Sequence, residues 1–242
     1  MFRYRALMTL VLLLSGPAES SECVNSWRSI FHGVVRDKSG APMRHLPLSH
    51  GIIVDSNILS YVVNTNGRRS EDVERIVGRI AKLKRIALKK DGQFHFYVTD
   101  TTAIEVGVAS GPERTGFAFP EGTRRILLDI DPNSNEYQGV LSKLDELGVG
   151  RSSRQSGVSD RRIVADAVFA QTTRGQVPTL WTADRGLYMP LCRLSPVCKR
   201  AIEKGTVIQD MADGFEIEFS AGRESRRLRI LPFFGRAPTE SN

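Results

Sequence analysis

Short apolar runs alternate with stretches of helical periodicity along this chain, and the alternation restricts the folds that it can adopt. The run 51–54, G-I-I-V, is fully apolar and mostly β-branched, which suits a strand buried on both faces of a parallel sheet. Residues 70–90 instead place apolar side chains at helical spacing, with acids near the start and bases near the end. Strands that alternate with helices need crossover connections, so the pattern predicts an α/β fold with a mainly parallel central sheet. We expect strands at 51–54, 94–98, 125–130 and 179–182, and helices at 70–90, 99–108, 137–147 and 159–173, the last capped by Ser159.

The segments on either side of this alternating region have different patterns. Residues 21–50 mix polar residues, Gly and Pro without periodicity, and we expect an irregular lead-in there. Phe215, Ile217 and Phe219 alternate with glutamates, which predicts a C-terminal β-hairpin. The sequence is therefore divided into a lead-in at 21–50, an α/β domain at 51–198 and a β extension at 199–242.

The first twenty residues have the layout of a secretory signal peptide. Arg3 and Arg5 precede an apolar run at 6–14, and small and polar residues follow before an expected cut ahead of Ser21. The apolar run is too short to span a membrane, which takes about 20 residues. We expect an exported protein, periplasmic or secreted, if this leader is genuine; a mis-assigned start on a cytoplasmic protein is the alternative.

Three cysteines, Cys23, Cys192 and Cys198, leave one thiol over in any intramolecular pairing. They have no His or Cys neighbour at zinc-binding spacing, so a zinc site is not expected. In an oxidising compartment Cys192 and Cys198 could close a short loop, whereas inside a cell they would be two half-buried thiols.

The charge balance favours an anionic partner without identifying one. The 34 Lys and Arg residues exceed the 27 Asp and Glu residues, which gives a net charge of +7. Lys and Arg attract phosphate over long distances, so nucleic acid is one candidate partner, and a solvated basic surface is an equally good explanation. A hydrophobic content of 40% in 242 residues is enough for a core that needs no disulfides.

Four acids stand where the active residues of an open α/β sheet gather, at the carboxyl ends of strands and in the following helical turns. Asp55 follows the first strand and Asp184 the last parallel strand, while Glu105 and Asp160 lie early in two predicted helices. Each acid alone has an ordinary explanation as a cap, a turn residue or an exposed side chain. Four at equivalent positions suggest clustered oxygen ligands for a hard cation such as Mg²⁺ or Mn²⁺.

Other acids compete for these roles. Asp166 shares a predicted helix with Asp160 but lies about 120° around it, so it is a second choice. Asp100 is better explained as a helix cap, and Asp129 and Asp131 as a strand exit and a turn.

The acids occur in short motifs that resemble, in order and setting, those of PIN-domain metal-dependent nucleases across residues 51–188. The motifs are G-I-I-V-D-S-N-I-L-S-Y, T-D-T-T-A-I-E-V, S-D-R-R-I-V-A-D-A-V-F-A and L-W-T-A-D-R-G. The resemblance implies a three-layer α/β/α fold with Asp55, Glu105, Asp160 and Asp184 as catalytic metal ligands. It also implies Asn57 and Thr182 as supporting polar groups near the metal. The C-terminal hairpin and the predicted leader depart from the family pattern.

The resemblance also implies a reaction and its partners. One or two Mg²⁺ or Mn²⁺ ions would activate a water for attack on a phosphodiester, with RNA the expected target and DNA an alternative. Arg161, Arg162 and Arg185 flank the acids and could hold a nucleic-acid backbone. An exported member would be a secreted effector or toxin, with an antitoxin or immunity protein and a homodimer as candidate assemblies. An inactive RNA-binding or scaffold module and a metal-dependent phosphatase are the alternative functions.

Overall fold

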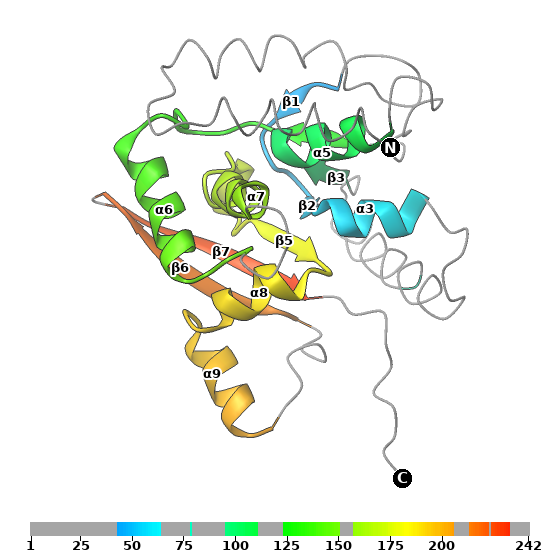
Figure 1. Ribbon diagram of the computed structural model, residues 1–242. Helices are drawn as coiled ribbons and strands as arrows, with labels where there is room; N and C mark the ends of the chain where they lie inside the picture. The colour runs from blue at the N-terminus through cyan, green and yellow to red at the C-terminus, as the bar shows by residue number, and fades with distance from the viewer. Residues whose placement is uncertain are drawn as a thin grey trace, which may run out of the picture.

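The computed structural model describes residues 43–63, 78, 95–110, 123–150, 157–205, 213–222 and 224–232 (Figure 1). The predicted leader at 1–20, Cys23, most of the lead-in and the predicted helix at 70–90 lie outside these residues, apart from Gly78, which is helical. In the part of the chain that the structure describes, no helix is long and apolar enough to cross a membrane.

A mainly parallel sheet forms the centre of the molecule. Its strand order is β1-β4-β3-β2-β5-β7-β6, in which every neighbouring pair is parallel except the β6–β7 hairpin. The predicted α/β class, parallel sheet and C-terminal hairpin are therefore confirmed. The strands are β1 His45–Leu46, β2 Gly51–Val54, β3 His95–Val98, β4 Arg124–Ile126, β5 Thr179–Thr182, β6 Phe215–Ala221 and β7 Glu224–Pro232.

Apolar side chains cover both faces of the sheet because successive residues of a strand point to opposite sides. Ile53 of β2 belongs to the larger core, with α6, α7 and α8, whereas its neighbours Ile52 and Val54 pack with α3 and α5. Leu180 and Trp181 of β5 divide in the same way. The helices therefore form layers on either side of the sheet.

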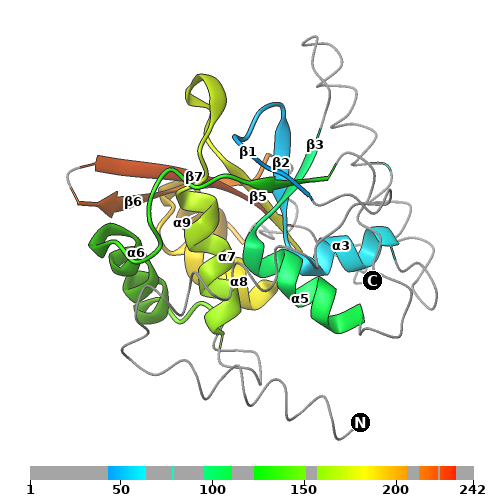
Figure 2. The same cartoon turned by 90° about the horizontal axis from the view of Figure 1, so that it is seen from above.

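The helices are α3 Ser56–Val63, α5 Asp100–Ser110, α6 Asn135–Glu146, α7 Val158–Val168, α8 Arg185–Cys192 and α9 Pro196–Glu203, with a short 3-10 helix at Thr173–Gly175. In both Figure 1 and Figure 2, α3 and α5 lie beside β2 and β3, and α6 lies at the far side of α7 and α8. The helices α5 and α6 occur close to where the sequence predicts them.

The predicted helix at 159–173 is too long and begins at the wrong residue. Gly157 occupies the N-cap position of α7. The helix ends at Val168, and Ala170 beyond it forms an antiparallel β-bridge with Leu128. The predicted strand at 125–130 is shortened at the same place, since Asp129 donates its backbone N–H to the carbonyl of Phe169.

The chain on both sides of the predicted domain takes part in the sheet. Residues His45–Leu46, in the expected irregular lead-in, form an edge strand beside β4. Strand β7 pairs in parallel with β5, so the hairpin continues the central sheet rather than standing apart from it. The domain boundaries at residues 50 and 198 stay predictions.

Candidate active site

Four carboxylates converge from four elements at one edge of the sheet. Asp55 lies between β2 and α3, and Asp184 lies between β5 and α8. Glu105 lies in α5 after β3, and Asp160 lies in the first turn of α7. Strands β3, β2 and β5 are parallel neighbours, so their carboxyl ends meet at the same edge, where Figure 2 shows α3, α5, α7 and α8 gathered. We call Asp55, Glu105, Asp160 and Asp184 the acidic cluster.

Asp55 is buried, with 2% of its surface exposed, and three side chains donate hydrogen bonds to it. Thr182 donates its hydroxyl to Oδ2 of Asp55 at 2.7 Å, and Asn57 donates its amide to the same oxygen at 3.4 Å. The Ser56 hydroxyl donates to Oδ1 at 3.2 Å. Hydrogen bonds to an ionised carboxylate favour its charged form, so these donors offset part of the cost of burial.

Thr182 also links Asp55 to Asp184. Its hydroxyl oxygen accepts the backbone N–H of Asp184 at 3.0 Å while its proton goes to Asp55. Asp184 in turn caps α8, since its Oδ1 accepts the backbone N–H of Gly186 at 2.6 Å. The ends of β2 and β5 are thereby fixed relative to each other, with the supporting positions Asn57 and Thr182 both in contact with Asp55.

The carboxylates act on one another electrostatically. Burial raises the pKa of Asp55, and the negative charge of Asp184 raises it further. Burial also raises the pKa of Glu105, with Asp55 and Asp184 adding to the shift. For Asp160, burial and then the charges of Asp184, Asp55 and Glu105 raise the pKa to about 7. The cluster is therefore a concentration of negative charge in a partly buried place.

Two serines that the sequence interpretation missed hold the second carboxylate. The side chains of Ser159 and Ser56 hydrogen-bond to Glu105 and lower its pKa against the effect of burial. Ser159 lies inside α7, which Gly157 precedes without a side-chain cap, so the prediction that Ser159 caps this helix is wrong. The signal in the sequence was that each serine stands next to one of the proposed acids, in D-S and in S-D.

The acidic cluster suits a hard divalent cation by its chemistry. Four carboxylates with strong mutual repulsion supply the oxygen ligands that Mg²⁺ and Mn²⁺ take. Among the described residues, no group of three or more His, Cys, Asp or Glu side chains is arranged to hold a metal ion. Binding would therefore have to draw the carboxylates closer together, which becomes favourable once a cation removes their repulsion.

The competing acids have other partners. Asp166 is buried, accepts the Tyr137 hydroxyl at 2.6 Å and lies 3.5 Å from that of Thr101, so it ties α7 to α6 and α5. Its reserve role at the acidic cluster stays a prediction.

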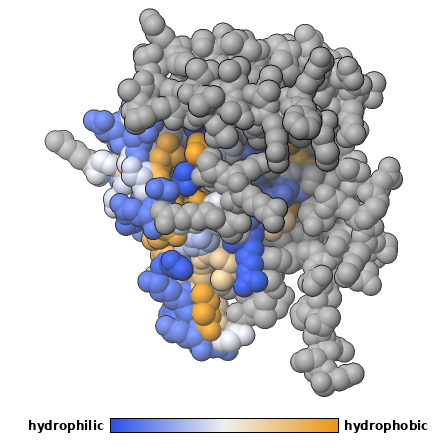
Figure 3. Space-filling model, in the orientation of Figure 1, coloured by the Kyte–Doolittle hydropathy of each residue, from blue (hydrophilic) through white to orange (hydrophobic). Residues whose placement is uncertain are grey.

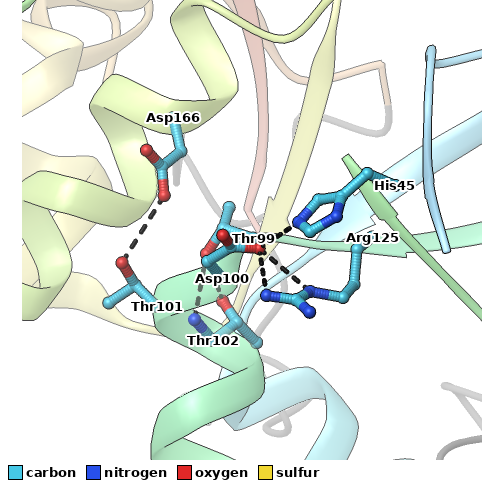
Figure 4. A network of polar contacts seen from close by, with 7 residues as sticks. All are labelled: His45, Thr99, Asp100, Thr101, Thr102, Arg125 and Asp166. Carbon is cyan, nitrogen blue, oxygen red and sulfur yellow. Dashed lines mark hydrogen bonds and ion pairs between the residues drawn. The ribbon is translucent and has the colours of Figure 1, made fainter. Parts of the chain in front are cut away.

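Asp100 lies in a separate ion-pair network, which Figure 4 shows in detail. Arg125, a buried residue of β4, donates to Oδ1 of Asp100 at 2.8 and 3.0 Å, and His45 Nε2 lies 2.9 Å from the same oxygen. Burial pushes the pKa of Asp100 upwards, but His45 and Arg125 outweigh it and hold the pKa below its ordinary value. The helix cap is Thr99, whose hydroxyl accepts the backbone N–H of Thr102, so the cap prediction for Asp100 is wrong.

Asp129 and Asp131 lie where the sequence predicts them, at a strand exit and in a turn. Asp129 forms an ion pair with Arg226 at 2.5 Å after β4, and Asp131 accepts the backbone N–H of Asn133 in a turn.

The three predicted phosphate-binding arginines differ in their surroundings. Arg161 pairs with Asp145 at 3.0 Å and also donates to the carbonyl of Val149, which commits its guanidinium to the fold. Arg162 and Arg185 are exposed in α7 and α8, two residues after Asp160 and one residue after Asp184. Arg161 is the arginine whose charge acts on Asp160 and lowers its pKa, whereas Arg162 and Arg185 are the two that are exposed to a ligand from solvent.

Two glycines in left-handed conformations pack against Asp160. Gly150 and Gly157 have φ values of 76° and 63°, and a Cβ on Gly150 would lie 2.7 Å from both Asp160 Oδ2 and Gly157 Cα. Gly150 also donates its N–H to the carbonyl of Gly186 at 3.3 Å. That carbonyl is available because Pro190, four residues later in α8, has no N–H to offer it. This contact fixes the start of α7, with Asp160, against the start of α8, with Asp184.

Replacing Gly150 by Ala is expected to displace Asp160 and to weaken metal binding by about 10- to 100-fold. The added Cβ meets the carboxylate and a second backbone at distances that atoms do not tolerate, and the positive φ adds strain. We expect a loss of stability of roughly 2–3 kcal/mol. Calorimetric Mn²⁺ titration and thermal unfolding measure the two effects, with Gly139→Ala in α6, where nothing lies within 4 Å, as the control. Unchanged metal affinity in folded Gly150→Ala would show that this contact does not position Asp160.

Comparisons with known proteins found one solved structure with a distant similarity to this chain. No family model matches the sequence, and no curated protein matches it. One solved structure, described as VapBC2 from Rickettsia felis bound to a DNA fragment from their promoter, is 13% identical with a TM-score of 0.36. The match covers 57% of this chain and 92% of the other. At that level of similarity we take no function from it.

Proposed function

We propose that this chain is a PIN-like, metal-dependent nuclease that hydrolyses RNA with the acidic cluster as its Mg²⁺ or Mn²⁺ site. The observation that carries the proposal is the convergence of four acids from four elements, with the pKa of Asp160 raised to about 7. Burying several carboxylates together costs stability, so their presence indicates a function that needs them. Groups with strongly shifted pKa values are often found at functional sites.

Residues of the chain would prepare the site in two ways. Thr182 orients one oxygen of Asp55 and fixes the backbone of Asp184, while Ser159 orients Glu105. Asp160 has to release its proton before it can act as a ligand, so metal binding should release protons near neutral pH.

The chemistry itself needs no covalent intermediate on the protein. The hydroxyls of Ser56 and Thr182 donate to Asp55, and we assign them the role of positioning this carboxylate. A bound cation would lower the pKa of the attacking water and stabilise the negative charge that develops on the phosphodiester during attack. Arg162 and Arg185, exposed at the starts of α7 and α8, would attract the phosphates on either side.

The test is cleavage of a labelled RNA with and without Mg²⁺ or Mn²⁺. We expect cleavage that depends on the metal, stops with EDTA and leaves a chromogenic phosphomonoester intact. Hydrolysis of the monoester without RNA cleavage would instead identify a phosphatase, and RNA cleavage in EDTA would reject the metal mechanism.

An RNA-binding or scaffold module without turnover is the second candidate. The observation in its favour is that, in the described part of the chain, the acids are not arranged as ligands of one ion. It would retain RNA without cleaving it and would gain no stability from metal.

An exported effector or toxin is the biological setting that we propose. The support comes from the disulfide between Cys192 and Cys198, whose Cα atoms lie 5.3 Å apart, because disulfides persist in oxidising compartments. The predicted leader, the antitoxin or immunity partner and the homodimer stay predictions.

A further inference from the structure

The segment that follows the acidic cluster in the chain presents a row of cations. Its exposed basic residues are Arg193, Lys199, Arg200 and Lys204, and we call the segment from Arg193 to Lys204 the basic arm. Glu203 is the acid among them. None of the four basic side chains forms an ion pair with another residue that the structure describes. The arm therefore carries a net positive charge that nothing in this part of the fold neutralises.

The arm has a fixed place relative to the acidic cluster. Helix α8 starts directly after Asp184 and, with eight residues, extends for about 12 Å. The disulfide between Cys192 and Cys198 then fastens α9 to the end of α8, and Ser195 caps α9 by accepting the N–H of Cys198. Cys198 is fully buried in the main core. The basic side chains are consequently held on the outward side of α9.

The pictures agree with this placement. Figure 1 shows α9 beyond α8, at the end of the molecule away from α5 and β1. Figure 3 shows hydrophilic residues flanking an apolar strip over this region, where Val197 and Ile202 are exposed.

Electrostatics gives such an arm a use in a nuclease of this kind. Without a bound cation the acidic cluster repels a polyanion, so cations away from the cluster add to the attraction that brings a strand to it. Interactions between exposed charges are largely screened beyond about 8 Å at physiological salt. Helix α8, which separates Asp184 from the start of the basic arm, is itself about 12 Å long, so the acidic cluster does not cancel the charge of the arm.

We propose that the basic arm binds the phosphate backbone of a nucleic-acid strand at a distance from the phosphodiester that the acidic cluster attacks. The substrate class is then a strand long enough to reach from the cluster to α9, rather than a dinucleotide. This inference rests on the proposed nuclease function for its biological meaning, but strand binding can be measured without cleavage.

The binding test compares a variant with Lys199→Gln, Arg200→Gln and Lys204→Gln with the wild-type protein. In EDTA, anisotropy of a labelled single-stranded RNA of roughly 20 nucleotides is followed as salt is raised. Each lost phosphate contact lowers the salt slope by roughly 0.7, so the variant should lose about 2 from the slope and bind about tenfold more weakly. DNA of the same sequence should respond alike if only the backbone is recognised, whereas a response confined to RNA would assign recognition to the ribose.

The matched control removes three exposed cations from elsewhere: Arg44→Gln, Lys143→Gln and Arg227→Gln. It has the same net charge as the arm variant and should bind RNA within about twofold of wild type. Equal losses in both variants would mean that only net charge matters, and an arm variant with wild-type slope and affinity would likewise overturn the proposal. Both variants should keep the wild-type melting temperature, because the replaced side chains are exposed.

Cleavage separates this inference from the proposed function. With Mg²⁺ present, the arm variant should show about a tenfold higher KM on the long RNA with kcat retained, because it loses attraction and keeps the acidic cluster. Arm-dependent binding by a wild-type protein that never cleaves would support the arm and reject the nuclease. Cleavage by wild type with no effect of the arm variant on KM or binding would support the nuclease and reject the arm.

Discussion

Asp55→Asn is expected to lower the rate of RNA cleavage by about 1,000-fold or more, which corresponds to about 4 kcal/mol of transition-state stabilisation. Asn keeps the side-chain oxygen that accepts the Thr182 hydroxyl but removes one negative charge from the centre of the acidic cluster. The fold should therefore survive. Because the removed charge raises the pKa of Glu105 and Asp160, the metal-free variant should melt at the wild-type temperature or a few degrees higher.

The measurement combines single-turnover cleavage in Mg²⁺ with thermal unfolding in EDTA. Asp131→Asn is the matched control, since Asp131 is exposed in a turn and contributes nothing to the shifts in the cluster. An inactive variant that is also unfolded would leave Asp184→Asn to decide, because Asn is an equally good cap for α8. Full activity in folded Asp55→Asn would contradict the proposed site.

Raising the pH from about 5.5 to about 8.5 is expected to destabilise the metal-free protein, and Mn²⁺ is expected to reverse the loss. The pKa of Asp160 is raised from 3.8 to about 7 in the folded state, so between these values the folded chain binds a proton that the unfolded chain releases. Stability therefore falls as pH rises through this window, and the loss levels off about one unit above the folded-state pKa of about 7. The full shift would correspond to at most about 4 kcal/mol, of which the part above pH 5.5 is at most about 2 kcal/mol, and solvent screening at the half-buried side chain reduces the expected loss to roughly 1 kcal/mol.

Denaturant unfolding at several pH values, with and without Mn²⁺, checks this prediction. Asp160→Asn should have a flatter pH dependence and a smaller gain from metal. Asp100 does not interfere, because its pKa is lowered and its contribution is lost only at more acidic pH. A metal-free stability that rises between pH 5.5 and 8.5 would mean that Asp160 is not held among negative charges.

The sequence was sufficient to predict the strands nearest the site and the positions of the four acids. Val54 and Thr182 end short apolar runs, and an acid follows each run within two residues, which is a local pattern. The parallel arrangement then follows from the alternation of strands and helices, and it brings the acids to one edge.

Other features depend on contacts between distant parts of the chain. The two-residue strand β1 exists only because β4 lies beside it, and β7 joins the sheet through β5, which precedes it by more than forty residues. The short helix α8 has an internal Pro190, which hides its helical character, and it is stabilised by burial of residues such as Leu187 and Leu191. The roles of Ser159 and of Asp100 likewise depend on partners from other elements.

The most direct measurement of the central claim is anomalous diffraction from a crystal soaked in Mn²⁺ at a pH above 7. We predict a manganese peak surrounded by carboxylate oxygens of Asp55, Asp160 and Asp184, with Glu105 close by. Manganese bound elsewhere on an otherwise unchanged molecule, with the four carboxylates turned away from a common point, would contradict the account.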